Sequence, residues 1–396
     1  CIDEICIEPV CGDGIVSPGV EDCDAGAPEG GNGCTSTCTY EPVCVVTRDS
    51  DTGAVFQEDV ILRSFSIGAG GVPALVDQEV LVDSLGAPYP RTRALVACGG
   101  YVYAAAGPSS AIVGIEVGAD GTLGDALPPV PLSGISGFAC DGDGHLFAGT
   151  VSGGDVRLYA YDVAEDGALT AGTPASIEFD YNQTAQAARI VHHPEAAIVY
   201  VANSPVDVDD EVYISVVEHS AGTLSTPTPL FEDFGTFGGL RRMAVDSAEN
   251  TLLFHNVAEN SNSRTATCSG HRPLSQSGDA FDGGVAVSCS GIWSDTRSEA
   301  RFADGALFFS DDSGMWSIAP AGGGLMELED KVPANGEAPV LAIAHPDLMA
   351  VATRNTLETM REIPGRGGPS LETVASLDAP TVKREAMVVV PCPDAR

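Results

Sequence analysis

The sequence is poor in basic residues, and above all in lysine. Of its 396 residues 19 are Lys or Arg and 56 are Asp or Glu, which gives a formal net charge of −37. Lys331 and Lys383 are the only lysines. A surface this negative repels nucleic-acid phosphates and anionic lipids, so we discount both as partners. It suits a protein that stays soluble at high salt or holds divalent cations.

Long apolar runs and long amphipathic helices are also lacking. No run approaches the ~20 apolar residues of a membrane span, so none is expected. The sequence contains no HExxH, CxxCH, GxSxG, Walker or dinucleotide-binding motif, which leaves the corresponding metalloprotease, haem, hydrolase and nucleotide-binding classes without support.

Cysteine is plentiful by contrast. Seven of the twelve cysteines fall within the first 44 residues. An even count that is dense at one end predicts disulfides and an oxidising compartment, and hence a secreted or outer-surface protein. Because the chain begins at Cys1, we expect a processed, mature form. We favour a Cys1–Cys6 disulfide, and a lipid anchor on Cys1 is the alternative.

Residues 1–44 contain nine acids and no Lys or Arg. A segment this small and this polar cannot be stabilised by burial of apolar side chains. We therefore predict a disulfide-rich acidic module there. Residues 45–396 would form a second domain. Spacing leaves open how the module's cysteines pair, and these are Cys1, Cys6, Cys11, Cys23, Cys34 and Cys38.

After residue 45, short apolar runs alternate with Gly, Asp, Asn and Pro turns, which is typical of all-β proteins. A strand–turn–strand pattern recurs in stretches that begin at residues 93, 136, 188, 241, 299 and 340. A recurrence of ~40–50 residues indicates propeller blades. A seventh blade would join residues 382–392 to strands near residues 45–83, which removes an exposed sheet edge.

Three disulfides are expected in this domain. Cys44 and Cys392 lie where the ring would close, and their disulfide would lock it. Cys98 and Cys140 fall at equivalent inner-strand ends of adjacent blades. Cys268 and Cys289 flank one hairpin-like segment.

The stretches "VHHPEAAIVYVAN" (191–203) and "SAGTLSTPTPL" (220–230) resemble the lactonase-like, YVTN-type seven-bladed β-propellers. The resemblance covers residues 90–350 or so. It implies a seven-bladed propeller whose substrate cleft lies at the central opening, with Arg, His and Glu around it.

Arginines stand near the start of several expected inner strands. Aligned around a channel, they would form a basic ring that attracts an anionic ligand or another chain's carboxylates. Alternatively, they pair with acids of neighbouring blades as internal struts. The residues are Arg93, Arg189, Arg242, Arg301 and Arg384.

The segment "CGDGIVSPGVEDCDAGAPEGGNGCTSTC" (11–38) is similar to the myxococcus-type cysteine-rich repeat, which also occurs as a calcium module in pappalysin-like proteases. The resemblance implies Ca²⁺ held by oxygen ligands. Ala25 and Asn32 depart from the usual Asp. The alternative is a disulfide knot whose acids only cap turns. The candidate ligands are Asp13, Glu21, Asp22, Asp24 and Asn32.

The histidines carry a weaker signal. His192 and His193 alternate faces of a strand, so they are not expected to bind one metal together. The acidic turn "CDGDGHLF" (140–147) could hold a cation, although turn chemistry alone accounts for it.

Two functions follow. The favoured hypothesis is a non-enzymatic binding or assembly protein of the cell surface, such as a surface or filament component that binds other proteins or its own copies. The alternative is a lactonase-like hydrolase that acts on an anionic sugar lactone at the central cleft.

Overall fold

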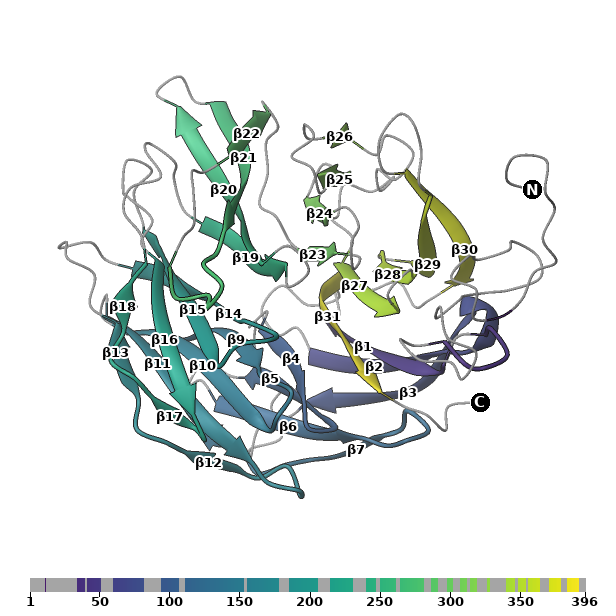
Figure 1. Cartoon of the computed structure of the whole chain (residues 1–396). Coiled ribbons are helices and arrows are strands. Elements are labelled where there is room, and N and C mark those ends of the chain that lie inside the picture. Colours follow the sequence, from purple (N-terminus) through teal and green to yellow (C-terminus); the bar gives the residue numbers. More distant parts are fainter. Residues whose placement is uncertain are drawn as a thin grey trace.

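The alternating apolar runs form antiparallel strands, which group within the described residues into seven sheets of four or five strands (Figure 1). The computed structural model describes residues 11, 34–39, 41–50, 60–81, 94–106, 111–152, 155–177, 185–205, 214–230, 240–246, 250–260, 264–280, 286–290, 298–301, 307–311, 314–318, 326–327, 340–345, 348–353, 355–363, 370–378 and 383–391.

Each sheet is one blade, and the blades follow one another along the chain. Blade 1 contains β1 (Val43–Ser50), β2 (Val60–Ile67), β3 (Pro73–Leu81) and the last strand, β31 (Lys383–Pro391), with the short 3₁₀ turn η1 (Ala69–Gly71) before β3. Blade 2 contains β4 (Leu95–Cys98), β5 (Tyr101–Ala106), β6 (Ala111–Val117), β7 (Leu123–Ala126) and β8 (Val130–Pro131). Blade 3 contains β9 (Ile135–Cys140), β10 (His145–Ser152), β11 (Asp155–Val163), β12 (Leu169–Ala171) and β13 (Ala175–Ile177).

The remaining blades repeat this plan. Blade 4 contains β14 (Ala185–His192), β15 (Ile198–Pro205), β16 (Ile214–Ser220), β17 (Thr223–Leu224) and β18 (Thr228–Pro229). Blade 5 contains β19 (Leu240–Asp246), β20 (Thr251–Asn260), β21 (Arg264–Pro273) and β22 (Ala286–Ser290). Blade 6 contains β23 (Ser298–Arg301), β24 (Leu307–Asp311), β25 (Gly314–Ile318) and β26 (Met326–Glu327). Blade 7 contains β27 (Val340–His345), β28 (Leu348–Ala352), β29 (Thr356–Ile363) and β30 (Ser370–Asp378).

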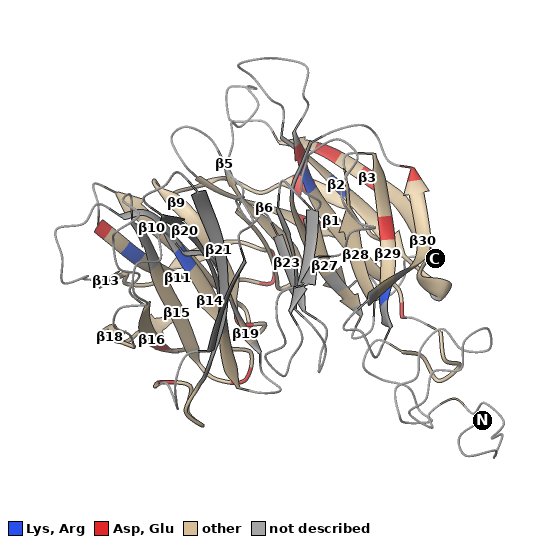
Figure 2. Ribbon diagram, turned by 90° about the horizontal axis from the view of Figure 1, so that it is seen from above, with Lys and Arg blue, Asp and Glu red and all other residues tan. Residues whose placement is uncertain are grey.

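The innermost strands lie around a common centre (Figure 1), and Figure 2 shows the same molecule turned by 90° about the horizontal axis. Contacts join them in the order β23, β27, β31, β4, β9, β14 and β19. The predicted seven-bladed propeller is therefore confirmed. No helix of the described residues has the length and apolarity to cross a membrane.

Blade 1 closes the ring with strands from both ends of the chain. Its order is β3-β2-β1-β31, and β31 runs antiparallel to β1 with Val46 opposite Val388. The predicted closure by residues 382–392 is thus confirmed. Because β1 pairs with β2 on one side and with β31 on the other, it has no exposed edge.

Alternate residues of a strand pack toward different blades, because successive side chains point to opposite faces. In β1, Cys44 and Val46 lie in an apolar cluster with blade 2, whereas Val45 lies in a cluster with blade 7. The core therefore consists of layers between successive blades. Cys34 and Cys38 are also buried in the layer between blades 1 and 7.

The disulfides agree with the expected oxidising compartment, and two are described in full. Cys98–Cys140 joins blades 2 and 3 as predicted, and Cys11–Cys38 joins the two ends of the N-terminal cysteine-rich segment. Both indicate folding in an oxidising environment.

The other cysteine pairs remain predictions. Cys44 is disulfide-bonded, but Cys392 lies outside the described residues. Cys268 stands directly opposite Cys289 in the β21–β22 register, which is where a bridge would form. Cys1, Cys6 and Cys23 lie outside the described part of the chain.

Candidate functional site

Four of the five candidate arginines lie on innermost strands of the ring. Arg189, Arg242, Arg301 and Arg384 belong to β14, β19, β23 and β31. Arg93 lies outside the described residues, just before β4. The fold therefore brings the backbones of these four residues to the wall of the central opening.

The side chain of Arg189 is half-buried on β14. It shares a strand face with Val191 and His193, because residues two apart point the same way. Val191 packs in the cluster that blades 4 and 5 share, and His193 Nε2 lies 3.0 Å from Asn250 Oδ1, at the β19–β20 turn of blade 5. Arg189 therefore faces the boundary of blades 4 and 5.

A second group of polar side chains lies between blades 3 and 4, and it begins in the turn from β9 to β10. Asp141 Oδ1 accepts hydrogen bonds from the backbone N–H groups of Asp143 (2.8 Å) and His145 (3.0 Å). Asp141 Oδ2 lies 2.5 Å from His145 Nδ1. Gly142 and Gly144 adopt positive φ, which lets the turn fold back on the carboxylate.

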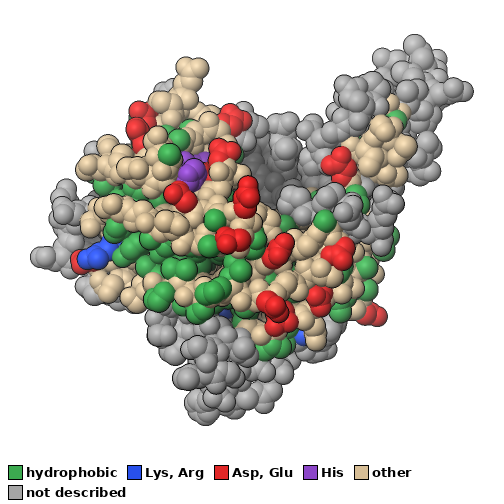
Figure 3. Space-filling view, turned by 90° about the horizontal axis from the view of Figure 1, so that it is seen from below, with side chains coloured by type: hydrophobic (Ala, Val, Ile, Leu, Met, Phe, Trp, Pro, Cys, Tyr) green, Lys and Arg blue, Asp and Glu red, His purple; other side chains and the backbone are tan. Residues whose placement is uncertain are grey.

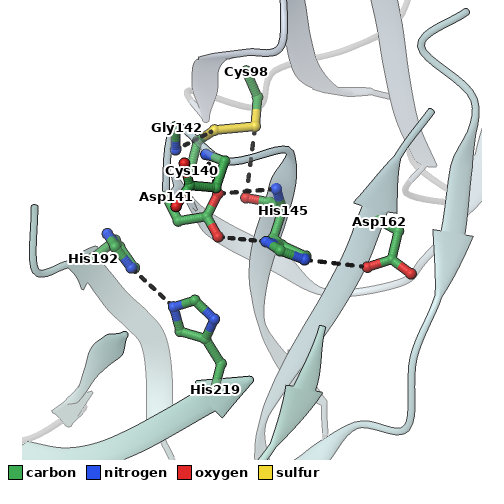
Figure 4. A network of polar contacts seen from close by, with 9 residues as sticks. Cys98, Cys140, Asp141, Gly142, His145, Asp162, His192 and His219 are labelled. Carbon is green, nitrogen blue, oxygen red and sulfur yellow. Dashed lines mark hydrogen bonds and ion pairs between the residues drawn. A yellow bond between two sulfur atoms is a disulfide. The ribbon is translucent and has the colours of Figure 1, made fainter. Parts of the chain in front are cut away.

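Blade 4 supplies two histidines to the same group (Figure 4). His192 ends β14, His219 lies in β16, and their Nε2 atoms are 2.9 Å apart. One potential ligand atom from each of Asp141, His145 and His219 lies within 4.8 Å of the other two. We call Asp141, His145, His192 and His219 the interblade cluster.

Apolar packing and a disulfide hold the interblade cluster in place. The buried ring of Phe147, on β10, stacks on His192 at 5.8 Å and lies 4.8 Å from the ring of His219. The Cys98–Cys140 disulfide anchors the residue that precedes Asp141. Neighbouring blades and a covalent bond therefore restrict how far these side chains can move.

Burial sets the protonation of the cluster. Loss of solvent, aided by the nearby His219, lowers the pKa of His192 to about 4, and burial also lowers the pKa of His219. Burial alone would raise the pKa of Asp141, but hydrogen bonds from the backbone and ring of His145 and from the backbone of Asp143 outweigh it and lower that pKa. At neutral pH the cluster thus has neutral imidazoles at His192 and His219 beside an ionised carboxylate.

The cluster is open to solvent on one side. The side chain of His145 is 20% exposed and that of Asp141 is 3% exposed. Seen from below, histidine reaches the molecular surface among acidic side chains (Figure 3). An ion arriving at this face would therefore meet a negative field.

The sequence reveals only part of this cluster. His192 and His193 do point apart, as strand alternation predicts, since His192 meets His219 and His193 meets Asn250. The acidic turn around Asp141 was a visible signal. No sequence signal indicated that His145 would meet His219, because the two residues are distant in sequence and belong to different blades. The candidate calcium ligands Asp13, Glu21, Asp22, Asp24 and Asn32 lie outside the described residues.

Comparison with known proteins gives similarity of fold. No protein-family model and no curated protein matches the sequence. A solved protein from Lactobacillus plantarum has a TM-score of 0.59 and 13% identity, over 88% of this chain and 99% of that one. A putative 6-phosphogluconolactonase from Bacteroides uniformis has a TM-score of 0.56 and 14% identity, over 89% of this chain and 100% of that one.

A hypothetical selenium-binding protein from Sulfolobus tokodaii also matches, with a TM-score of 0.56 and 10% identity, over 89% of this chain and 94% of that one. At these identities the matches define the chain as a β-propeller similar in fold to lactonase-like proteins. They transfer no residue's role, and the cysteine-rich repeat is not confirmed by them.

Proposed function

We propose that the protein is a lactonase-like hydrolase that opens a sugar lactone carrying a carboxylate or phosphate at the central opening of the propeller. The observation that carries this proposal is the position of Arg189, Arg242, Arg301 and Arg384 on four innermost strands. Bases are scarce in this chain, with 19 against 56 acids. Four of them stand on strands around one opening, which is where an anionic ligand would need them.

The comparisons support a hydrolase more than a non-enzymatic surface protein, which the sequence alone favours. Putative 6-phosphogluconolactonases from Bacteroides uniformis and Bacteroides fragilis share the fold with TM-scores of 0.56 and 0.54. This support is by analogy, since one fold hosts many activities.

The arginines would have two roles in this reaction. A guanidinium group binds a carboxylate or phosphate through paired N–H donors, which would orient the substrate. A second one can stabilise the oxyanion that forms when water attacks the lactone carbonyl carbon. The ring C–O bond then breaks, the hydroxyl stays on the carbonyl, and the water's proton ends on the released alkoxide to give a hydroxy acid.

The test is turnover of a phosphorylated and a carboxylated sugar lactone by the intact protein and by two variants. We expect Arg189→Ala and Arg242→Ala each to lower kcat/KM by about 100-fold or more, as loss of an oxyanion donor does. Arg157→Ala is the matched control, because Arg157 is exposed on β11 in the body of blade 3. Circular dichroism checks that the variants are folded.

Two outcomes would contradict the proposal. The first is no turnover of either lactone by the intact protein, which would favour the binding or assembly platform. The second is full activity in both inner-strand variants.

A further inference from the structure

The interblade cluster brings together the ligand types that a transition-metal ion prefers. It contains three imidazoles and one carboxylate, from blade 3 (Asp141 and His145) and blade 4 (His192 and His219). Zn²⁺ is bound by such nitrogen and carboxylate groups, usually four in a tetrahedral arrangement at structural sites. Ca²⁺ takes oxygen ligands, so a group made mostly of nitrogens is unsuited to it.

We propose that Asp141, His145 and His219 bind one divalent transition-metal ion of the zinc class, which clamps blade 3 to blade 4, while His192 holds the ring of His219 from outside the ligand set. This site is separate from the proposed substrate site, because His192 and Arg189 stand three residues apart on β14 and so point to opposite faces. The proposal of a metal site holds whether or not the protein opens lactones.

The distances within the cluster fit a shared cation. Two nitrogens bound to one tetrahedral zinc ion at 2.0–2.1 Å lie roughly 3.3 Å apart. Asp141, His145 and His219 each have a ligand atom within 4.8 Å of the other two, so small side-chain rotations bring them to such separations. Asp141 Oδ2 and His145 Nδ1 are 2.5 Å apart, the distance of a hydrogen bond, and an ion that takes the place of the shared proton would move these two atoms apart.

The polar groups behind the ligands favour metal binding as well. His145 Nε2 lies 3.6 Å from Asp162 Oδ1, on β11. A proton on Nε2 that faces this carboxylate would leave Nδ1 with its lone pair toward Asp141. Carboxylates behind histidine ligands commonly orient the ring and raise its basicity in this way.

His219 offers a further nitrogen to the site. Its Nδ1 atom is buried and makes no hydrogen bond within the described residues. Such a buried, unsatisfied polar atom is costly unless a partner reaches it. With His192 at its other nitrogen, His219 occupies the centre of the cluster, and its loss should disrupt the site most.

The turn at Gly222 brings blade 4 close to the cluster. Gly222 has a φ of +73° and packs so closely on Asp162 and on the ring of His145 that a Cβ atom would clash with the Asp162 carboxylate. This contact, the Phe147 ring and the Cys98–Cys140 disulfide prearrange the ligands before an ion binds. Preorganised sites of this kind lose little conformational entropy on binding.

The experiment is titration of the full, chelator-treated chain with ZnCl₂ by calorimetry. Excess CaCl₂ is present throughout, so that sites built from oxygen ligands are already filled. We expect one Zn²⁺ per chain, a higher melting temperature with Zn²⁺, and the visible absorption of tetrahedral Co²⁺ when cobalt replaces zinc.

Variants assign the binding to the cluster. His219→Ala and His145→Ala should each weaken Zn²⁺ binding by at least about 100-fold, since even loss of an outer carboxylate costs about 10- to 100-fold. Asp162→Asn should fall in that smaller range. The control is His193→Asn, because His193 is the sequence neighbour of His192 but binds Asn250 on the opposite face; it should retain full affinity.

Clear results would overturn the proposal. One is no Zn²⁺ binding by the intact chain, which would make the cluster an Asp141–His145 ion pair beside a His192–His219 hydrogen bond. Another is Zn²⁺ binding that persists undiminished in His145→Ala, whose ring is partly exposed and whose replacement the fold should tolerate. Binding lost equally in His193→Asn would also contradict it.

Discussion

At the scale of single residues, blade 1 buries charged side chains that no sequence pattern reveals. Asp49 is fully buried and Arg63 is 5% exposed. Arg63 Nη1 donates to Asp49 Oδ2, which also accepts from Thr47 Oγ1 at 3.2 Å, and Arg63 Nε donates to Gln78 Oε1 at 3.3 Å. Buried charges are tolerated when paired and hydrogen-bonded in this way.

Replacing Asp49 tests the importance of this network. We expect Asp49→Ala to lower the free energy of unfolding by about 3–5 kcal/mol, because it leaves the Arg63 guanidinium buried without its carboxylate. Asp155→Ala, at an exposed position on β11, should change it by less than about 0.5 kcal/mol. Urea denaturation measures both. An effect of Asp49→Ala as small as the one expected for Asp155→Ala would show that Asp49 is not stabilising.

At the scale of elements, hydrogen bonds from tyrosine to glycine join successive blades at equivalent positions. Tyr103 and Tyr200 occupy the second strands of blades 2 and 4, and their hydroxyls donate to the carbonyls of Gly167 (2.9 Å) and Gly278 (2.7 Å) in the following blade. Gly167 has a φ of +75°, and a Cβ there would meet the ring of Tyr101. The glycine of the repeated turn "DGAL" is therefore required by both its backbone and its neighbour.

The Cys98–Cys140 disulfide offers a prediction at this scale. It joins residues 42 apart in sequence, so its removal frees a long loop in the unfolded chain. We expect Cys98→Ser with Cys140→Ser to lower the free energy of unfolding by about 4 kcal/mol, as measured by denaturant titration. The same pair should weaken Zn²⁺ binding, because Cys140 precedes Asp141. A variant as stable as the parent would mean that the blade 2–blade 3 packing suffices alone.

At the scale of the whole molecule, stability depends on closing the ring. β31 supplies the innermost strand of blade 1, and Val390 lies in the apolar layer shared by blades 1 and 2. Without β31, the inner edge of β1 would be open and that layer exposed to water. An open edge of this kind also invites pairing with other chains.

Deleting residues 383–396 should therefore abolish cooperative unfolding and produce aggregates. The matched control deletes residues 393–396 alone, which leaves β31 and Cys392 in place. Thermal melting and size-exclusion chromatography would compare them. A monomeric, cooperatively melting protein without β31 would show that the other blades close without it.

The sequence by itself determined the all-β class, the positions of the blades, the closure by residues 382–392 and the Cys98–Cys140 bridge. These follow from a pattern that repeats along the chain, because each blade is a local unit of strands and turns. Once the repeats are aligned, equivalent positions such as Cys98 and Cys140 fall at matching strand ends in neighbouring blades.

Only the tertiary structure decided which side chains meet between blades. His145 and His219 converge, and Asp49 pairs with Arg63, because of how strands twist and how far sheets are offset when they pack. Neither pair follows from the spacing of apolar residues, which predicts the face of a strand and not the partner across it. The chemistry proposed for the interblade cluster therefore depends on the docking of blade 3 against blade 4.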